Sequence, residues 1–102
     1  MAQYKVYRNR RPSAAKAPFL LDVQSDLVTT PSRVVIPLAR KSYYRALYSK
    51  LSLALTVDGI EVVASAAELA AVDERDLGEP VADLAGRRTE ILAAIDFLLT
   101  GY

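Results

Sequence analysis

The chain of 102 residues contains no cysteine and no histidine. Without cysteine it has no disulfide, no thiolate metal site and no thiol nucleophile. Without histidine it lacks the commonest general base and the commonest metal ligand. No apolar run approaches the roughly 20 residues of a membrane span, and the basic N-terminus leads into no signal-type segment. The composition therefore predicts a single cytoplasmic domain with no metal, no cofactor and no membrane contact, poorly equipped for acid–base catalysis.

Charge is distributed unevenly along the chain, although the net charge is only +1. Residues 1–50 carry ten lysines and arginines against two aspartates, a net charge of +8, and residues 51–102 carry three arginines against ten acidic residues, a net charge of −7. Such asymmetry suggests that one face meets an acidic partner or nucleic acid. The alternative is that the fold interleaves the two halves and cancels the field. Neither half of the chain is charged densely enough to require a nucleic-acid partner.

Two segments show the alternation of apolar and polar residues that is typical of half-buried strands. The clearer one covers residues 51–64, where the alternation continues on both sides of Asp58 and Gly59. An Asp-Gly pair favours the positive φ angles of a type I′ turn, so this segment predicts a β-hairpin. A shorter alternation predicts a strand over residues 4–9, and residues 8–17 are predicted to form an exposed loop.

Two apolar runs, residues 20–23 and 34–38, predict buried strands. Pro37 has no backbone N–H and therefore favours a strand end or a sheet edge. Residues 40–50 follow as a mixture of basic and tyrosine residues, and their spacing predicts a mobile basic loop.

The last third of the chain predicts helical structure. Residues 66–72 are rich in alanine without glycine or proline, which favours two short helical turns. Gly78 and Pro80 then predict a break. Apolar residues at steps of three and four predict an amphipathic helix over residues 84–99, with Asp83 as its N-terminal cap. Strands followed by one C-terminal helix predict an α+β or small-barrel domain.

Residues 22–28 place three polar or charged side chains inside an otherwise apolar strand sequence. An unpaired buried polar group costs about 1–3 kcal/mol, so these side chains need partners. They are either the end of a strand whose side chains satisfy a turn, or a family signature. Asp22 and Asp26 are also the only close acidic pair in the first half of the chain. In an extended strand they would lie about 13 Å apart, too far to share a proton, so we expect no catalytic carboxylate pair.

The run Asp-Val-Gln-Ser-Asp-Leu-Val at residues 22–28 closely resembles the CcdB family of toxins, the gyrase poisons of toxin–antitoxin pairs. Residues 4–7 resemble the first strand of that family, residues 35–39 the segment after its turn, and residues 78–84 the start of its last helix, with Pro80 in place of the usual acidic residue. The four blocks keep the order and spacing of the family over nearly the whole chain. The resemblance implies an α+β fold: an SH3-like small antiparallel β-barrel of the CcdB/MazF type, with a long C-terminal helix, paired as a homodimer.

The resemblance also implies a function that needs no chemistry from this chain. Members of the CcdB family bind the A subunit of DNA gyrase and hold the enzyme with its DNA cleaved, without sequence-specific nucleic-acid binding by the toxin alone. Their contacts with gyrase come from an apolar pair after the conserved run, from the last helix and from the final residues. The corresponding positions in this sequence are Leu27, Val28, Asp96, Thr100, Gly101 and Tyr102.

Three of these positions depart from the family pattern. The C-terminal Trp-Gly-Ile of the family becomes Thr100-Gly101-Tyr102, and a helix asparagine becomes Asp96. A buried interface tryptophan is worth about 2–4 kcal/mol, which Thr100 cannot supply. Tyr102 could restore an aromatic anchor, because Gly101 lets the chain end bend. The strongest alternative is a relative that keeps the fold and the antitoxin but has lost gyrase poisoning.

A disordered, acidic antitoxin of the CcdA type is the second partner that the resemblance implies. The basic loop with Arg8, Arg10 and Arg11 is a plausible docking edge for it, because charge pairing would raise both association rate and affinity there. Solvated loop charges are the simpler alternative.

One enzymatic interpretation remains open at a lower weight. The related MazF-type endoribonucleases share the barrel and use a few arginine, serine and threonine side chains. Here Ser25, Thr30 and Arg33 lie near one turn, where the basic first half of the chain could hold phosphates.

Overall fold

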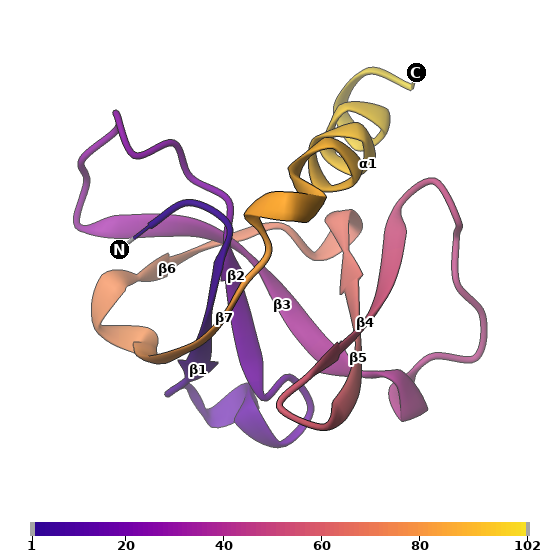
Figure 1. The fold of residues 1–102 in the computed structure, drawn as a ribbon, viewed down its shortest axis with the longest axis horizontal. Coiled ribbons are helices and arrows are strands. Elements are labelled where there is room, and N and C mark those ends of the chain that lie inside the picture. The colour runs from indigo at the N-terminus through magenta and orange to yellow at the C-terminus, as the bar shows by residue number, and fades with distance from the viewer. Residues whose placement is uncertain (1, 102) are drawn as a thin grey trace.

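The computed structural model describes residues 2–101. Seven strands, all paired antiparallel, form one curled sheet that wraps into a half-barrel, and a single long helix lies at one end of it (Figure 1). The strands are β1 (Lys5–Asn9), β2 (Phe19–Asp22), β3 (Ser32–Arg40), β4 (Ser52–Val57), β5 (Ile60–Ser65), β6 (Ala70–Asp73) and β7 (Leu77–Asp83). Their order is β4-β5-β3-β2-β1-β7, and β6 also pairs with β3. The predicted α+β class, with a barrel-like antiparallel sheet and a C-terminal helix, is confirmed.

The hydrophobic core lies within the curl of the sheet. Strands β1, β2, β3 and β5 supply most of its side chains, and Ile91 of α1 (Arg88–Thr100) packs against them. Complete burial of such a side chain stabilises the fold by about 1.5–3 kcal/mol, so this contact is a main attachment of the helix. The fully buried members are Val6, Phe19, Leu21, Ile36, Leu38, Val62 and Ile91.

The predicted hairpin is confirmed in detail. Strands β4 and β5 pair in register from Ser52 opposite Ser65 to Val57 opposite Ile60. Asp58 and Gly59 adopt φ angles of 50° and 76°. Both angles are positive, as a type I′ turn requires.

The expectation that Pro37 marks a strand end or a sheet edge is wrong. Pro37 lies inside β3, the central strand of the sheet, opposite Leu20 of β2. On its other side β3 pairs with β6 up to Val35 and with β5 from Leu38 onward. Pro37 falls in the gap between these two partner strands, where no ladder hydrogen bond is lost through its missing N–H.

Two expectations for residues 66–83 are also wrong. Only a 3₁₀ turn, η3 (Ala66–Glu68), forms in the alanine-rich segment, and β6 follows it. Gly78 and Pro80 lie within β7 rather than in a break. Strand β7 forms the outer edge of the sheet next to β1, and its register shifts beside Tyr7, which is opposite Pro80. An irregular edge strand tolerates proline, which the sequence pattern did not reveal.

Three further 3₁₀ turns lie in the connections: η1 (Pro12–Ala15) within the predicted exposed loop, η2 (Lys41–Tyr43) after β3 and η4 (Glu74–Asp76) before β7. The segment from η2 to β4 is otherwise irregular and mostly exposed, in agreement with the predicted basic loop. No helix within residues 2–101 is long and apolar enough to cross a membrane.

The C-terminal helix starts later than predicted. A 3₁₀ turn, η5 (Ala85–Arg87), precedes α1, and Asp83 Oδ1 accepts a hydrogen bond of 2.9 Å from the Ala85 N–H. Asp83 therefore bonds to the first residue of the 3₁₀ turn, whose cap position is Leu84, and Arg87 occupies the cap position of α1 without a capping side-chain hydrogen bond. Ile91 and Ala94 face the core, whereas Leu92 and Leu99 are exposed. The predicted single apolar stripe is thus divided between a buried and an exposed part.

We expect Gly78→Ala to lower the free energy of unfolding by about 1–2 kcal/mol. A Cβ atom at residue 78 would lie 3.0 Å from the backbone oxygen of Arg8 and 3.2 Å from Arg8 Cβ, so β7 would have to move away from β1. Gly86→Ala is the matched control, because a Cβ atom at residue 86 meets nothing within 4 Å. The control should be neutral or stabilising by up to about 1 kcal/mol. Urea denaturation followed by circular dichroism measures both, and equal effects would contradict the close β1–β7 contact.

Candidate functional site

A buried ion pair joins the two strands that flank the loop of residues 23–31. Asp22 at the end of β2 is 0% exposed, and Arg33 at the start of β3 is 6% exposed. Asp22 Oδ2 lies 2.7 Å from Arg33 Nη2 and accepts a hydrogen bond of 2.9 Å from Arg33 Nε. A two-point contact of this kind fixes the orientation of the guanidinium as well as its position.

Asp26 joins the same cluster from the other side of the loop. Its Oδ1 lies 3.8 Å from Arg33 Nη2 and accepts a hydrogen bond of 2.8 Å from the Gln3 N–H. Arg33 Nη2 also donates to the Gln24 carbonyl at 3.3 Å. The expected 13 Å separation of Asp22 and Asp26 is therefore wrong, because the chain turns after Asp22 instead of continuing as a strand. Both carboxylates therefore lie beside the same arginine side chain.

Gln24 closes the loop with its side chain. Its Nε2 donates to the Val28 carbonyl at 2.9 Å and to Thr30 Oγ1 at 3.1 Å, and its Oε1 accepts from the Val34 N–H at 2.9 Å. Every buried side-chain nitrogen and oxygen within residues 2–101 has a hydrogen-bond partner. The polar residues of the run thus satisfy a turn at a strand end, which was the simpler of the two interpretations.

Leu27 and Val28 lie at the tip of the loop that this cluster holds. The Leu27 N–H donates to Ser25 Oγ at 3.2 Å and the Val28 N–H donates to the Ser25 carbonyl at 3.0 Å. The turn leaves Leu27 95% exposed and Val28 about half exposed. Leucine and valine are usually buried, so it is unusual that a buried charged cluster keeps this apolar pair exposed to solvent.

The end of α1 carries the other predicted contact residues. Asp96, Thr100 and Gly101 are exposed, and Thr100 Oγ1 donates to the Asp96 carbonyl at 2.7 Å. Gly101 has a φ angle of 78° and its N–H donates to the Phe97 carbonyl at 2.9 Å, which is a left-handed helix cap. Tyr102 lies outside the described residues. Leu99 is also 69% exposed, although its helical spacing places it on the apolar stripe predicted for residues 84–99.

The loop and the helix are connected through the backbone of Tyr4. Its N–H donates to the Asp22 carbonyl at 2.6 Å, and its carbonyl accepts from the Leu84 N–H at 2.8 Å. Tyr4 makes both bonds with a φ angle of 67°, which is rare for a residue other than glycine. In Figure 1 the loop and the C-terminal half of α1 both lie at the upper end of the molecule, on opposite sides. Tyr4 therefore links the base of one element to the start of the other.

The three arginines of the predicted docking edge differ in their surroundings. Arg8 Nη2 lies 2.9 Å from Asp58 Oδ2, and Arg11 Nε lies 3.9 Å from Asp76 Oδ2. Both acids come from the acidic second half, so the fold cancels part of the charge asymmetry at this place. Arg10 is exposed and has no acidic partner among the described residues. An exposed ion pair contributes about 0–1 kcal/mol to stability, so Arg8 and Arg11 can exchange these acidic partners for others.

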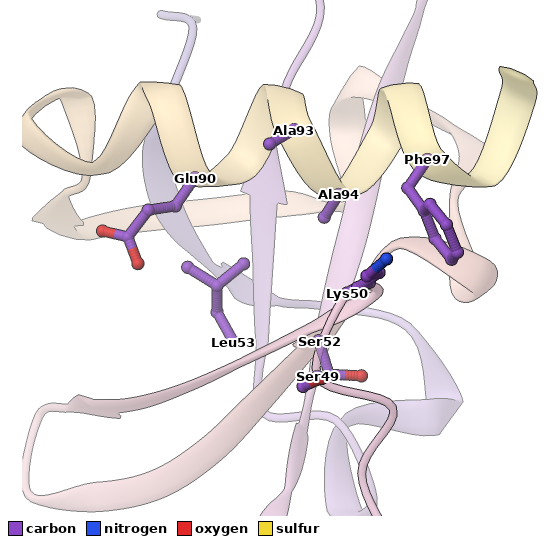
Figure 2. Close-up of a pocket in the computed structure, with 8 residues that line it drawn as sticks. All are labelled: Ser49, Lys50, Ser52, Leu53, Glu90, Ala93, Ala94 and Phe97. Carbon is purple, nitrogen blue, oxygen red and sulfur yellow. The ribbon is translucent and has the colours of Figure 1, made fainter. Parts of the chain in front are cut away.

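The residues considered for ribonuclease chemistry are used within the loop. Arg33 is buried against Asp22, and Ser25 and Thr30 hydrogen-bond to neighbouring loop atoms. No group of three or more acidic residues suited to a metal ion occurs within residues 2–101. A groove of about 290 Å³ lies between α1 and the start of β4, lined by small and apolar side chains together with Lys50 and Glu90 (Figure 2). Glu90, one of the two charged residues of the groove, is paired with Arg87.

Burial of the Asp22–Arg33 ion pair costs free energy of desolvation. Desolvation raises the pKa of the Asp22 carboxyl above its ordinary value, and the hydrogen bonds from Arg33 and from the Gln24 N–H oppose this effect. The raised pKa means that the partners do not fully replace the lost water. The pair therefore determines the geometry of the loop more than it stabilises the fold.

We expect Asp22→Leu and Arg33→Met each to lower the free energy of unfolding by about 3–5 kcal/mol, because each leaves one buried charge without its partner. The double variant Asp22→Leu/Arg33→Met should be no less stable than the better single variant, since it removes both charges. Urea denaturation of the four proteins gives the coupling energy. Additive losses would show that the two residues stabilise the fold independently.

Comparison with known proteins identifies the family. The family model described as CcdB protein matches residues 3–101. Among solved structures, an endoribonuclease in complex with its cognate antitoxin from a mycobacterial species has a TM-score of 0.76 at 17% sequence identity, and the match covers 97% of this chain and 94% of that chain. An endoribonuclease from a mycobacterial species has a TM-score of 0.72 at 18% identity, covering 97% of this chain and 90% of that chain. These two likenesses concern the fold, whereas the family match extends over nearly the whole sequence: the chain belongs to the CcdB family.

Proposed function

We propose that this chain is the toxin of a type II toxin–antitoxin pair, a cytoplasmic homodimer that binds the A subunit of DNA gyrase and traps the enzyme with its DNA cleaved. It acts by binding and performs no chemistry of its own. The observation that carries the proposal is the exposed Leu27-Val28 pair on a loop fixed by the Asp22–Arg33 cluster. Membership of the CcdB family supports the choice of gyrase as the partner.

The loop is suited to a binding role because it is ordered before a partner arrives. Burying a fully exposed leucine at an interface contributes about 1.5–3 kcal/mol. Part of such a gain is normally lost when a flexible loop becomes ordered. Gln24, Asp26 and Arg33 already hold the turn in one shape, so Leu27 keeps most of the gain.

The end of α1 supplies the second contact. Thr100 cannot replace the tryptophan of other family members, and its hydroxyl is bonded to the Asp96 carbonyl. Leu92 and Leu99, seven residues apart on the exposed side of α1, present apolar surface instead. Loss of about 3 kcal/mol of binding free energy, if nothing replaced the tryptophan, would weaken binding about a hundredfold. We infer that Leu99 and Tyr102 together make up for the missing tryptophan.

No observation favours ribonuclease activity over this proposal. The two solved structures described above are endoribonucleases, but at 17% and 18% identity they carry no residue roles to this chain. Arg33, the one arginine of the predicted set, is buried beside Asp22 and cannot reach a phosphate without unfolding the loop.

A gyrase supercoiling reaction tests the proposal. With the protein added, linear DNA should accumulate after detergent and protease treatment. Leu27→Asp should reduce this product at least a hundredfold, because it places a charge in a desolvated apolar contact. Deletion of residues 101 and 102 should do the same by removing the tail contact.

The controls separate binding from folding. Leu27 is almost fully exposed, so Leu27→Asp should change the free energy of unfolding by less than about 0.5 kcal/mol. Ala67→Asp, which adds the same charge at an exposed residue of η3, should leave poisoning unchanged. Absence of linear DNA with the unaltered protein and a gyrase from its host would overturn the proposal and leave a CcdB fold that has lost this activity.

We also propose that an acidic, disordered antitoxin segment binds along Arg8, Arg10 and Arg11. The segment would displace Asp58 and Asp76 from Arg8 and Arg11 at little cost, and it would find Arg10 without an acidic partner among the described residues. Arg10→Ala should therefore weaken binding of the antitoxin encoded with the toxin more than Arg8→Ala or Arg11→Ala, by about three- to tenfold, in isothermal titration calorimetry. Arg88→Ala, which removes an exposed arginine at the start of α1, is the charge-matched control. Unchanged affinity in the triple alanine variant would exclude this docking edge.

A further inference from the structure

The loop between β3 and β4 is a basic surface segment that also carries aromatic residues. No acidic residue occurs between Asp26 and Asp58, a stretch that contains this entire loop. Residues 40–50 carry four cationic side chains and three tyrosines. These are Arg40, Lys41, Arg45, Lys50, Tyr43, Tyr44 and Tyr48.

The loop is attached to the body of the protein at both ends. Tyr44 is half-buried, and burial together with the nearby Glu68 raises the pKa of its phenol. Lys50 lies over the Phe97 ring of α1, 5.2 Å from the ring centroid, as Figure 2 shows from the side of the groove. The Leu51 N–H donates to the Tyr48 carbonyl at 2.9 Å and closes a turn before β4. These contacts position the middle of the loop.

Two aromatic rings and two cations of this loop face solvent. Tyr43 is 56% exposed and Tyr48 is 75% exposed. Lys41 and Arg45 are exposed and take part in none of the side-chain hydrogen bonds or ion pairs found within residues 2–101. Three acidic residues lie at the edges of the loop: Glu61, which lines a shallow hollow with Arg40 and Lys41, Glu68 beside Tyr44, and Glu90, which lines the groove with Lys50 and is paired with Arg87. Positive charge therefore predominates where the rings are exposed.

We propose that this loop binds single-stranded nucleic acid without base specificity, with Lys41 and Arg45 on phosphates and Tyr43 and Tyr48 stacked on bases. Exposed aromatic side chains among unpaired cations are the features that sequence-tolerant single-strand binding uses, because every base offers a flat face. A duplex would satisfy the cations but leave the rings unused, since its bases are already stacked. An acidic peptide would likewise pair with the cations alone. The proposal goes beyond the binding of gyrase and does not depend on it.

Fluorescence anisotropy with a labelled oligothymidylate of about 16 nucleotides tests the proposal. The unaltered protein should bind saturably, and an excess of a blunt duplex of the same length should compete at least about tenfold less well than the unlabelled single strand. Tyr43→Leu/Tyr48→Leu should weaken binding at least about tenfold, whereas Tyr43→Phe/Tyr48→Phe should keep it. Because the chain has no tryptophan, binding should also quench the tyrosine fluorescence directly.

The charges are tested separately by salt dependence. Lys41→Gln/Arg45→Gln should reduce the slope of log K against log salt concentration by about 1.4, since each phosphate contact to a single strand accounts for about 0.7. Arg75→Gln/Arg88→Gln removes two exposed positive charges outside the loop and should leave affinity and slope nearly unchanged.

Three results would overturn the proposal. They are the absence of saturable binding by the unaltered protein, equal affinity of the leucine and phenylalanine variants, and competition by a poly-glutamate peptide as strong as by the oligonucleotide. The last result would identify the loop as a surface for acidic proteins.

Discussion

The Asp22–Arg33 ion pair is the constraint on which the candidate site depends. It stands where β2 ends and β3 begins, and it requires the chain to turn immediately after Asp22. Once the guanidinium is fixed, the Gln24 carbonyl and Asp26 gather around it, and the Gln24 side chain closes the loop from within. A loop of this length without such a cluster would pay the ordering cost on binding. The polar residues therefore hold the turn that leaves Leu27 and Val28 exposed to solvent.

The same cluster connects to the rest of the fold through Tyr4. With its positive φ angle, this buried residue bonds to the base of the loop on one side and to the start of the helical segment on the other. Backbone strain of this kind persists only where the surroundings determine it fully. Here the surroundings are β1, the half-barrel core and the turn before α1. A change at Tyr4 would therefore disturb the loop and the helix together, although it touches neither Leu27 nor Leu99.

Local patterns in the sequence predicted the hairpin, the positions of β1, β2 and β3 and the C-terminal helix, because these patterns act within a few residues. The predictions were wrong where a contact with a residue distant in the sequence determines the local structure. Pro37 is tolerated because two partner strands leave a gap beside it, and Pro80 because β7 is the irregular edge of the sheet. The predicted distance between Asp22 and Asp26 failed for a similar reason, since Arg33 lies eleven residues from Asp22. The exposure of Leu99 was not predicted, because helical spacing cannot show how much of an apolar stripe the body of the protein covers.

The distribution of charge also depends both on the local sequence and on contacts between distant parts of the chain. The sequence separates a basic half from an acidic half, and the fold brings them together unequally. At Arg8 and Arg11 the acidic half supplies Asp58 and Asp76, so much of the positive potential there is neutralised. At the β3–β4 loop Glu61 and Glu68 lie at the margins, and Lys41 and Arg45 face solvent. Both surfaces follow from one unbalanced composition, but only the second combines unpaired charge with exposed aromatic rings. Unpaired positive charge alone would attract any flexible polyanion to the loop, and the tyrosines are what would allow the protein to distinguish a nucleic acid from an acidic peptide.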